Sequence, residues 1–307
     1  MAAAIQIENV HKHYGNVHAL KGMSLSIEKG EFFGLLGPNG AGKSTLINII
    51  AGLTRMDSGH VSVMGHDVVK AYRQSRQCLG VVPQELVFDP FFSVREILQI
   101  QAGYFGKGKQ SAAWIDDLLE GLKLTDKADS NMRQLSGGMK RRVLIAQALV
   151  HKPDVVILDE PTAGVDVELR SSLWEFVKML HNDGHTIVLT THYLEEAETL
   201  CQRIAIVNQG QLVALDSKES LLARGVGTTC TVSVTLAEPL LHIAEILARK
   251  IKSIDDTKIE FILNRDTDTI ISLVDELRQS GAEIIDLRTE DADLEDVFIE
   301  LTGQQSA

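Results

Sequence analysis

The stretch Gly34–Thr45, GLLGPNGAGKST, decides the fold. It places the pattern Gly37-x-x-x-x-Gly42-Lys43-Ser44 after a short apolar run and before a segment with helical spacing. Strand, glycine loop and helix in this order are the context expected of a Walker A phosphate loop. The glycines let the backbone wrap the phosphates, the lysine neutralises their charge, and the serine hydroxyl is a ligand for Mg²⁺. The sequence therefore predicts a nucleotide site at Gly37, Pro38, Asn39, Gly40, Ala41, Gly42, Lys43, Ser44 and Thr45.

A second apolar run, VVILDE, ends in two acidic residues. Its aliphatic residues predict a strand buried on both faces, which carries Asp159 and Glu160 to the carboxyl end where ligands bind in such sheets. We expect Asp159 to hold Mg²⁺ and Glu160 to polarise a water that attacks the γ-phosphate. An apolar strand that ends in two acids is by itself a common solvated edge, but the preceding phosphate loop favours the functional interpretation.

The segment QLSGGMKRRVLIAQAL predicts an amphipathic helix with Ser136 as its N-cap and a glycine pair, Gly137 and Gly138, at its start. Free backbone N–H groups and the positive end of the helix dipole suit an anion. The chain thus carries a second candidate phosphate site. The simpler alternative is a capped helix start that binds nothing.

The remaining segments predict an α/β core. Residues 18–37 indicate a strand, a turn and a strand, and HTIVLTTH indicates another buried strand. RIAIVNQGQLVALD indicates a hairpin, and residues of about 85–150 are mostly helical. After Gly225 the pattern indicates strands at 229–236, 258–263 and 283–288 and helices at 240–250, 269–281 and 293–303, which predict a small α+β domain. We predict domains at 1–224 and 225–307.

Charge and composition narrow the function classes. The chain has 307 residues and a net charge of −12, and residues 225–307 hold 7 basic and 17 acidic side chains. Because the acidity belongs to the C-terminal part and no basic surface is evident, composition argues against nucleic-acid binding. Three scattered cysteines indicate reduced thiols. Without a secretory signal pattern or an apolar run of about 18–20 residues, we expect a cytoplasmic chain.

Five motifs in a fixed order resemble the ATP-binding subunits of ABC transporters: GPNGAGKST, VVPQE, LSGGMKRR, VVILDEPTAGVD and LTTHYLEEAE. The similarity covers roughly residues 4–220. The run TEDADLEDVFIELTG resembles the C-terminal extension of ATP-binding subunits from ABC-2-type exporters, whose members move drugs, polysaccharides or lipids outward. The resemblance implies a P-loop NTPase core of ABC type with an antiparallel β subdomain and a helical insert. It also implies an ATPase held at the inner face of the cell membrane by a separately encoded transmembrane permease.

The resemblance also implies how the second phosphate site is used. In this family two ATP-binding domains meet head to tail, and each LSGG loop covers the ATP held by the other domain. Ser136, Gly137 and Gly138 would then bind the γ-phosphate on a second copy of the chain, so that ATP joins the dimer and hydrolysis releases it. Met139 stands where many members have Gln, and we do not count it among the site residues.

Four further residues match family positions. Gln84 is implied to reach Mg²⁺ and the attacking water, His192 to contact the γ-phosphate, and Asp166 to communicate across the dimer. Tyr14 is implied to stack on adenine. Phe88, Phe91 and Phe92 either fill a core or line a groove for a helix of the membrane partner.

Two other functions stay open. One is a soluble ABC ATPase that acts on ribosomes or DNA, and the other is a regulatory ATPase whose C-terminal domain senses a ligand. Soluble members usually carry two ATPase units in one chain, long coiled-coil inserts or zinc cysteines, and the sequence shows none of these.

Overall fold

The computed structural model describes residues 3–163, 167–191, 193–225, 229–239, 247, 249–264, 267–290 and 294–303. The chain divides into two compact units, residues 1–218 and residues 219–305. The division falls at the start of helix α8 (Lys218–Gly225). The boundary predicted at residue 224 lies near the other end of the same helix.

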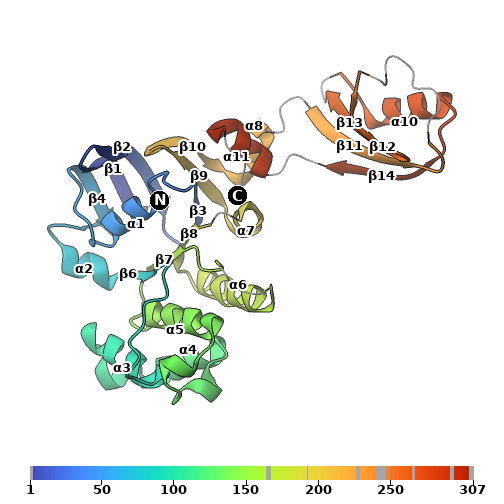
Figure 1. The fold of residues 1–307 in the computed structure, drawn as a ribbon. Helices are drawn as coiled ribbons and strands as arrows, with labels where there is room; N and C mark the ends of the chain where they lie inside the picture. Colours follow the sequence, from blue (N-terminus) through green and yellow to red (C-terminus); the bar gives the residue numbers. More distant parts are fainter. Residues whose placement is uncertain are drawn as a thin grey trace. The chain divides into compact units, whose positions relative to one another are not determined.

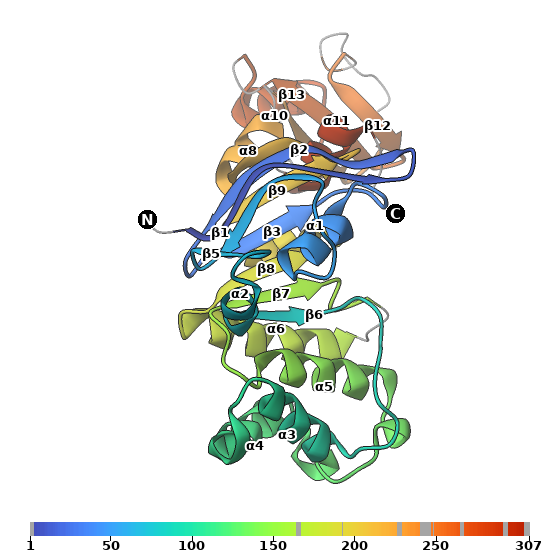
Figure 2. The same ribbon diagram turned by 90° about the vertical axis from the view of Figure 1, so that its left-hand side faces the viewer.

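The first unit is built on a six-stranded sheet with the order β10-β9-β3-β8-β7-β6 (Figure 2). Its strands are β3 (Phe32–Leu36), β6 (Leu79–Val82), β7 (Val155–Asp159), β8 (Thr186–Thr190), β9 (Arg203–Asn208) and β10 (Gln211–Ser217). All neighbours are parallel except β10, which pairs antiparallel with β9. Every residue of β3, β7 and β8 is buried, which matches the apolar runs in the sequence.

The predicted hairpin at the end of this unit is present. It turns at Gln209 and Gly210, which both have positive φ, 49° and 79°. Two successive positive φ angles suit the right-handed twist of the strands on either side of a two-residue turn. The turn brings Gln209 to the cavity described below.

A second sheet, with the order β2-β1-β4-β5, forms the antiparallel subdomain. Its strands are β1 (Ala3–Tyr14), β2 (Val17–Glu28), β4 (Ser58–Val63) and β5 (His66–Asp67). Helix α1 (Lys43–Ile50) follows the phosphate loop. Ile5 of β1, Leu46 of α1 and Val188 of β8 belong to one buried apolar cluster, so α1 and both sheets share a core.

The helical insert connects β6 to β7 and lies beyond the β6 edge of the large sheet (Figure 2). It contains α3 (Val94–Tyr104), α4 (Ala112–Gly121), α5 (Gly137–Leu149) and the short 3-10 turns Gly108–Ser111, Thr125–Lys127 and Met132–Gln134. The other helices of the first unit are α2 (Tyr72–Gln77), α6 (Val167–Asn182) and α7 (Leu194–Leu200). Ser93 starts α3 with a capping box, in which its side chain and that of Glu96 each bond the other's backbone N–H.

The second unit is a small α+β fold (Figure 1). Its sheet has the order β12-β13-β11-β14, with strands β11 (Thr229–Leu236), β12 (Ile251–Asp255), β13 (Lys258–Asn264) and β14 (Ile284–Glu290). Helices α10 (Ile270–Gln279) and α11 (Leu294–Thr302) complete the described elements. Val232, Phe261 and Leu273 lie in its apolar core. The helix predicted at residues 240–250 falls mostly outside the described residues.

Strand β12 was not predicted from the sequence, because only its first residue is even partly buried and its pattern carries little signal. Within the described residues of both units, no helix combines the length and the apolar character needed to cross a membrane.

Candidate functional site

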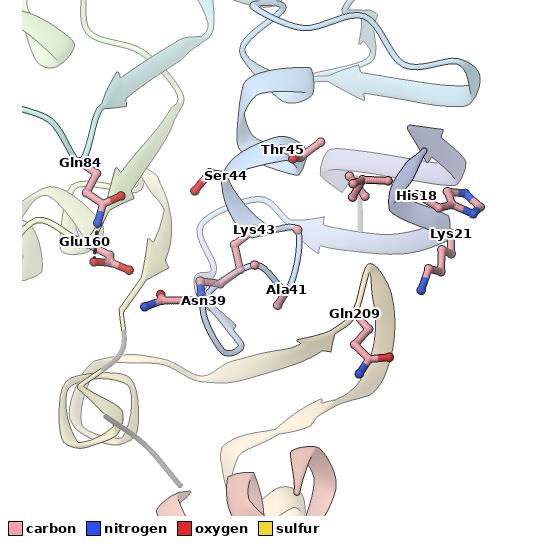
Figure 3. Close-up of a pocket in the computed structure, with 14 residues that line it drawn as sticks. His18, Lys21, Asn39, Ala41, Lys43, Ser44, Thr45, Gln84, Glu160 and Gln209 are labelled. Carbon is pink, nitrogen blue, oxygen red and sulfur yellow. Dashed lines mark hydrogen bonds between the residues drawn. The ribbon is translucent and has the colours of Figure 1, made fainter. Parts of the chain in front are cut away.

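A cavity of about 500 Å³ lies over the phosphate loop (Figure 3). Gln84 and Glu160 line one end of the cavity, and His18, Lys21 and Gln209 line the other. Residues 39–45 lie between the two ends. The volume is in the range of small-molecule sites, and a nucleotide could extend from one end to the other.

The phosphate loop requires glycine where it meets the antiparallel sheet. Gly42, the N-cap of α1, has φ 106°. A Cβ atom at Gly42 would lie 2.8 Å from the carbonyl oxygen of Ala19, so the close approach of the two chains also excludes a side chain. Helix α1 therefore begins at the cavity, with its unpaired N–H groups available to phosphate.

Lys43 is buried at the start of α1 and faces the loop. Its Nζ donates hydrogen bonds to the carbonyl oxygens of Gly37 at 2.5 Å and of Pro38 at 3.2 Å. Burial lowers the pKa of Lys43, and the carboxylates of Glu160 and Asp159 oppose that shift. The ammonium group is thus held among the loop carbonyls, beside the space where phosphates would lie.

Asp159 ends β7 and is tied to the neighbouring strand. The Thr190 hydroxyl donates to Asp159 Oδ1 at 2.5 Å, and the Glu160 N–H donates to the Thr190 carbonyl oxygen at 3.0 Å. Burial raises the pKa of Asp159, while the Thr190 hydrogen bond and the Lys43 charge work against it. The pairing of β7 with β8 therefore sets the positions of both acidic residues.

The oxygen donors of Asp159, Ser44 and Gln84 are of the kind that suits a Mg²⁺ ion. Ser44 and Gln84 line the cavity and offer a hydroxyl and an amide oxygen, which are hard ligands like the carboxylate of Asp159. No cluster of three or more His, Cys, Asp or Glu suited to a metal occurs in the described part of the chain. A Mg²⁺ ion here would therefore be held by few protein oxygens together with phosphate oxygens, which is its usual arrangement.

Glu160 is paired with Gln84 across the end of the cavity. Gln84 Nε2 donates to Glu160 Oε2 at 2.9 Å (Figure 3). Glu160 is 8% exposed and has φ 46°, a left-handed conformation that is costly for a residue other than glycine. Backbone strain of this kind persists only where the surrounding structure fixes it. The Glu160 side chain lines the cavity.

Arg141 was not singled out from the sequence, although the structure connects it to this site. It is buried on α5, and its guanidinium donates to the carbonyl oxygens of Pro83 at 2.6 Å and of Gln84 at 2.7 Å. Helix α5, which begins with the glycine pair, is thereby attached to the backbone of Gln84. Arg141 lies three and four positions before Leu144 and Ile145, and this helical spacing predicts that all three share the buried face.

The glycine pair lies apart from the cavity. Ser136 caps α5 and accepts a hydrogen bond from the Met139 N–H at 3.3 Å. Ser136 and Gly137 are exposed, and neither these residues nor Gly138 line the cavity. A Cβ atom at Gly137 would meet nothing within 4 Å. One chain therefore presents this loop toward open space.

Of the other predicted residues that the structure describes, Tyr14, Gly37, Pro38 and Asp159 do not line the cavity. Tyr14 is 48% exposed, does not line the cavity, and has Lys12 Nζ at 5.2 Å from its ring. The residues of this region that do line the cavity are Val17, His18 and Ala19. His192 and Asp166 lie outside the described residues.

His18 was not identified from the sequence. Its ring stacks on that of His13 with 3.8 Å between centroids. Burial lowers the pKa of His18, and the neighbouring His13 lowers it further.

Comparison with known proteins decides the family. The family model described as "ABC transporter" matches residues 20–163. The Linearmycin resistance ATP-binding protein LnrL of Bacillus subtilis is 37% identical over 313 residues, covering 98% of each chain. The Nod factor export ATP-binding protein I of Burkholderia orbicola is 39% identical over 306 residues, covering 99% of this chain and 98% of that protein. This chain belongs to the ABC transporter family.

Solved structures agree with this assignment. An ATP-binding subunit of an ABC transporter aligns with a TM-score of 0.68 and 26% identity, over 72% of this chain and 92% of that one. A dimeric ATP-binding cassette in a post-hydrolysis state, bound to ADP and Pi, aligns with a TM-score of 0.63 and 29% identity, over 69% of this chain and 98% of that one. The predicted fold is confirmed. This chain is an ATP-binding subunit with ATPase activity.

Proposed function

We propose that this ABC ATPase powers export through a separately encoded transmembrane permease. The observation that carries the proposal is the cavity in which the phosphate loop, Lys43 and the Gln84–Glu160 pair meet. One relative that matches almost the whole chain supports the direction, since it is named for Nod factor export. The permease would hold the subunit at the inner face of the membrane.

Within one cavity the residues take separate roles. Lys43 and the N–H groups of the loop neutralise the phosphates, and the Glu160 carboxylate accepts a proton from the attacking water. Gln84 orients Glu160 through their hydrogen bond. Ser44, Asp159 and Gln84 would hold Mg²⁺, which when bound offsets phosphate charge. Phosphoryl transfer needs mainly positioning and charge stabilisation, and these groups supply both.

A second copy of the chain would complete each site. Ser136 caps a 13-residue helix that begins with Gly137 and Gly138, and none of these three residues lines its own chain's cavity. Ser136 and Gly137 are exposed. The solved cassette bound to ADP and Pi is a dimer. We propose a head-to-tail homodimer in ATP, in which this loop closes over the partner's nucleotide, His192 contacts the γ-phosphate and Asp166 communicates between the sites.

The segment after Gln84 offers a surface for the permease. Val87 is 67% exposed and Phe91 is 78% exposed, while Phe88 lies under Lys140 Nζ at 4.5 Å from its ring. Exposed apolar side chains that are clustered in sequence are typical of protein interfaces. Because Gln84 directly precedes this surface, a permease helix bound there would contact the segment that orients Glu160.

The test is Glu160→Gln. Hydrolysis should fall about 100-fold or more because the base is lost, while ATP binding remains. The variant should then form a stable dimer in ATP, measured by light scattering, and should co-purify with a polytopic membrane protein from solubilised native membranes. Lys43→Ala is the matched control, which should stay monomeric in ATP. A monomeric Glu160→Gln protein in saturating ATP would contradict the dimer, and recovery with ribosomes or DNA instead would contradict the transport role.

We further propose that residues 1–224 form the ATP-binding domain and 225–307 an accessory domain. A chain that ends after residue 224 should bind ATP with the affinity of the full chain, measured by calorimetry. Loss of ATP binding on truncation would show that the boundary is misplaced.

A further inference from the structure

A buried carboxylate outside the cavity joins the segments that leave two neighbouring strands. Glu196 of α7 is 6% exposed. Its Oε2 accepts hydrogen bonds from the Thr162 hydroxyl at 3.1 Å and from the Thr191 hydroxyl at 2.8 Å. Both threonines are buried as well. A single oxygen atom therefore holds two residues that are almost thirty positions apart in the sequence.

The two threonines lie next to residues assigned to hydrolysis. Thr162 is two positions after Glu160, beyond the carboxyl end of β7. Thr191 follows β8 directly and precedes His192. The Thr191 hydroxyl also accepts a hydrogen bond from the Tyr193 N–H at 3.0 Å. The contacts of Glu196 thus act on the chain just after β7 and just after β8.

The charge of Glu196 is balanced from a third element. Arg170 Nε of α6 lies 3.5 Å from Glu196 Oε1, and the Arg170 guanidinium lies over the Tyr193 ring at 4.7 Å from its centroid. A buried carboxylate is costly unless a cation and hydrogen-bond donors compensate it. Here the cation faces Oε1 as an ion pair without a hydrogen bond among the described residues, and the two hydroxyls bond Oε2, so Oε2 is the oxygen that is fixed. Bonds to a charged acceptor are also stronger than bonds to a neutral one.

Glu160 needs support of this kind. Its left-handed backbone, φ 46°, is kept only if residues on both sides are fixed. The backbone N–H of Glu160 is bound to Thr190 on one side. The Thr162 hydroxyl, bound to Glu196, supplies the attachment on the other side.

We propose that Glu196 is a positioning residue for ATP hydrolysis, which fixes the segments carrying Glu160 and His192 relative to each other through Thr162 and Thr191. The inference rests on the proposed roles of Glu160 and His192. Glu196 does not line the nucleotide cavity, so its contribution falls on the chemical step and not on ATP binding. A catalytic group that moves by about 1 Å loses about 100-fold in rate, which makes such support measurable.

The test is a comparison of kcat and KM in full-length variants. Glu196→Ala should lower kcat about 10- to 100-fold and leave the KM for ATP within about twofold of wild type. Glu195→Ala, an exposed neighbour on the same helix, is the matched control and should behave as wild type. Glu196→Gln keeps an oxygen that can accept both hydroxyls, and it should recover about 10-fold of the rate lost in Glu196→Ala.

A second set of variants leaves the charge pair with Arg170 intact. Thr162→Val and Thr191→Val each remove one hydroxyl with little change of shape. Because both hydroxyls bind the same oxygen, the double variant should lose less than the product of the two single losses. This coupling remains measurable even if Glu196→Ala folds poorly.

Three results would overturn the inference. The first is a kcat of Glu196→Ala equal to that of Glu195→Ala. The second is a loss of ATP affinity large enough to account for the fall in rate. The third is a double threonine variant whose loss of kcat equals the product of the two single losses. Glu160→Gln, measured beside them, separates this inference from the proposed function. Wild-type hydrolysis by Glu160→Gln would refute the role of Glu160. An inactive Glu160→Gln with a fully active Glu196→Ala would refute only the role of Glu196.

Discussion

Gln84 and Glu160 are joined by a hydrogen bond of 2.9 Å from the amide Nε2 to the carboxylate Oε2, at the end of the cavity nearest the helical insert. Gln84 follows β6, the edge strand from which the insert begins, and Glu160 follows β7. The bond therefore joins the segment that enters the insert to the carboxylate assigned to hydrolysis. A displacement of the insert would therefore reach the reaction through this hydrogen bond.

Gln84→Ala should lower kcat about 10- to 100-fold, because Glu160 loses a donor that orients it and the proposed Mg²⁺ site loses an amide oxygen. The affinity for ATP should change little, since the phosphate loop is untouched. Steady-state ATPase kinetics and calorimetric ATP binding measure the two effects. Glu85→Ala, at the exposed next position, should retain the wild-type rate, and equal rates for the two variants would show that the hydrogen bond has no role.

Arg141→Met should destabilise the first unit by about 3 kcal/mol, since the carbonyls of Pro83 and Gln84 each lose a charged donor. Arg141→Lys should restore only part of this loss, because an ammonium group cannot reproduce the two-pronged geometry of guanidinium. Thermal unfolding by calorimetry measures both. Lys140→Met on the same helix is the control and should cost about 1 kcal/mol or less, since it removes a contact with the Phe88 ring. Equal losses at the two positions would contradict the assigned role of Arg141.

Asp159→Asn should stabilise the nucleotide-free protein at neutral pH by about 1 kcal/mol while abolishing Mg²⁺-dependent hydrolysis. Burial raises the pKa of Asp159 above its value in the unfolded chain, so the folded state prefers the protonated form. The wild type should therefore lose stability relative to Asp159→Asn as pH rises through the folded pKa, and the two should converge below the ordinary aspartate pKa. Urea unfolding across acidic and neutral pH tests this sign. A variant less stable than wild type at pH 7 would contradict it.

His151→Phe should weaken the loss of stability on acidification. Burial lowers the pKa of His151 to about 4, its Nε2 bonds the Leu79 carbonyl oxygen at 3.1 Å, and its Nδ1 is buried without a hydrogen-bond partner among the described residues. Protonation would place a charge in this apolar site, where the ring also stacks on Phe105. The free energy of unfolding should keep its full value above about pH 6.5, the ordinary pKa of histidine in an unfolded chain. It should fall by up to about 3 kcal/mol as the pH drops toward 4.

Unfolding of wild type and His151→Phe between pH 7 and pH 4 measures this effect. An equally steep slope for His151→Phe would assign the acid sensitivity to other groups.

The parts of the site that could be predicted are those in which neighbouring residues act together. The phosphate loop is one contiguous motif, and Asp159 and Glu160 end a buried strand whose apolar run is visible in the sequence. Strand β12 could not be predicted, since a mostly exposed strand carries little pattern. Tyr14 lies at the end of β1 and does not line the cavity, so its stacking on adenine stays a prediction.

The sequence by itself determined the family from the order of its motifs, and it predicted the phosphate loop and the pair of acids, because each motif consists of residues close together along the chain. Only the tertiary structure decided that Gln84 reaches Glu160, that Arg141 binds the backbone of Gln84, and that one oxygen of Glu196 holds Thr162 and Thr191. These contacts join residues from separate strands and helices. Side chains so far apart in sequence leave no local pattern, and only the packing of the sheet and the insert brings them within hydrogen-bond distance.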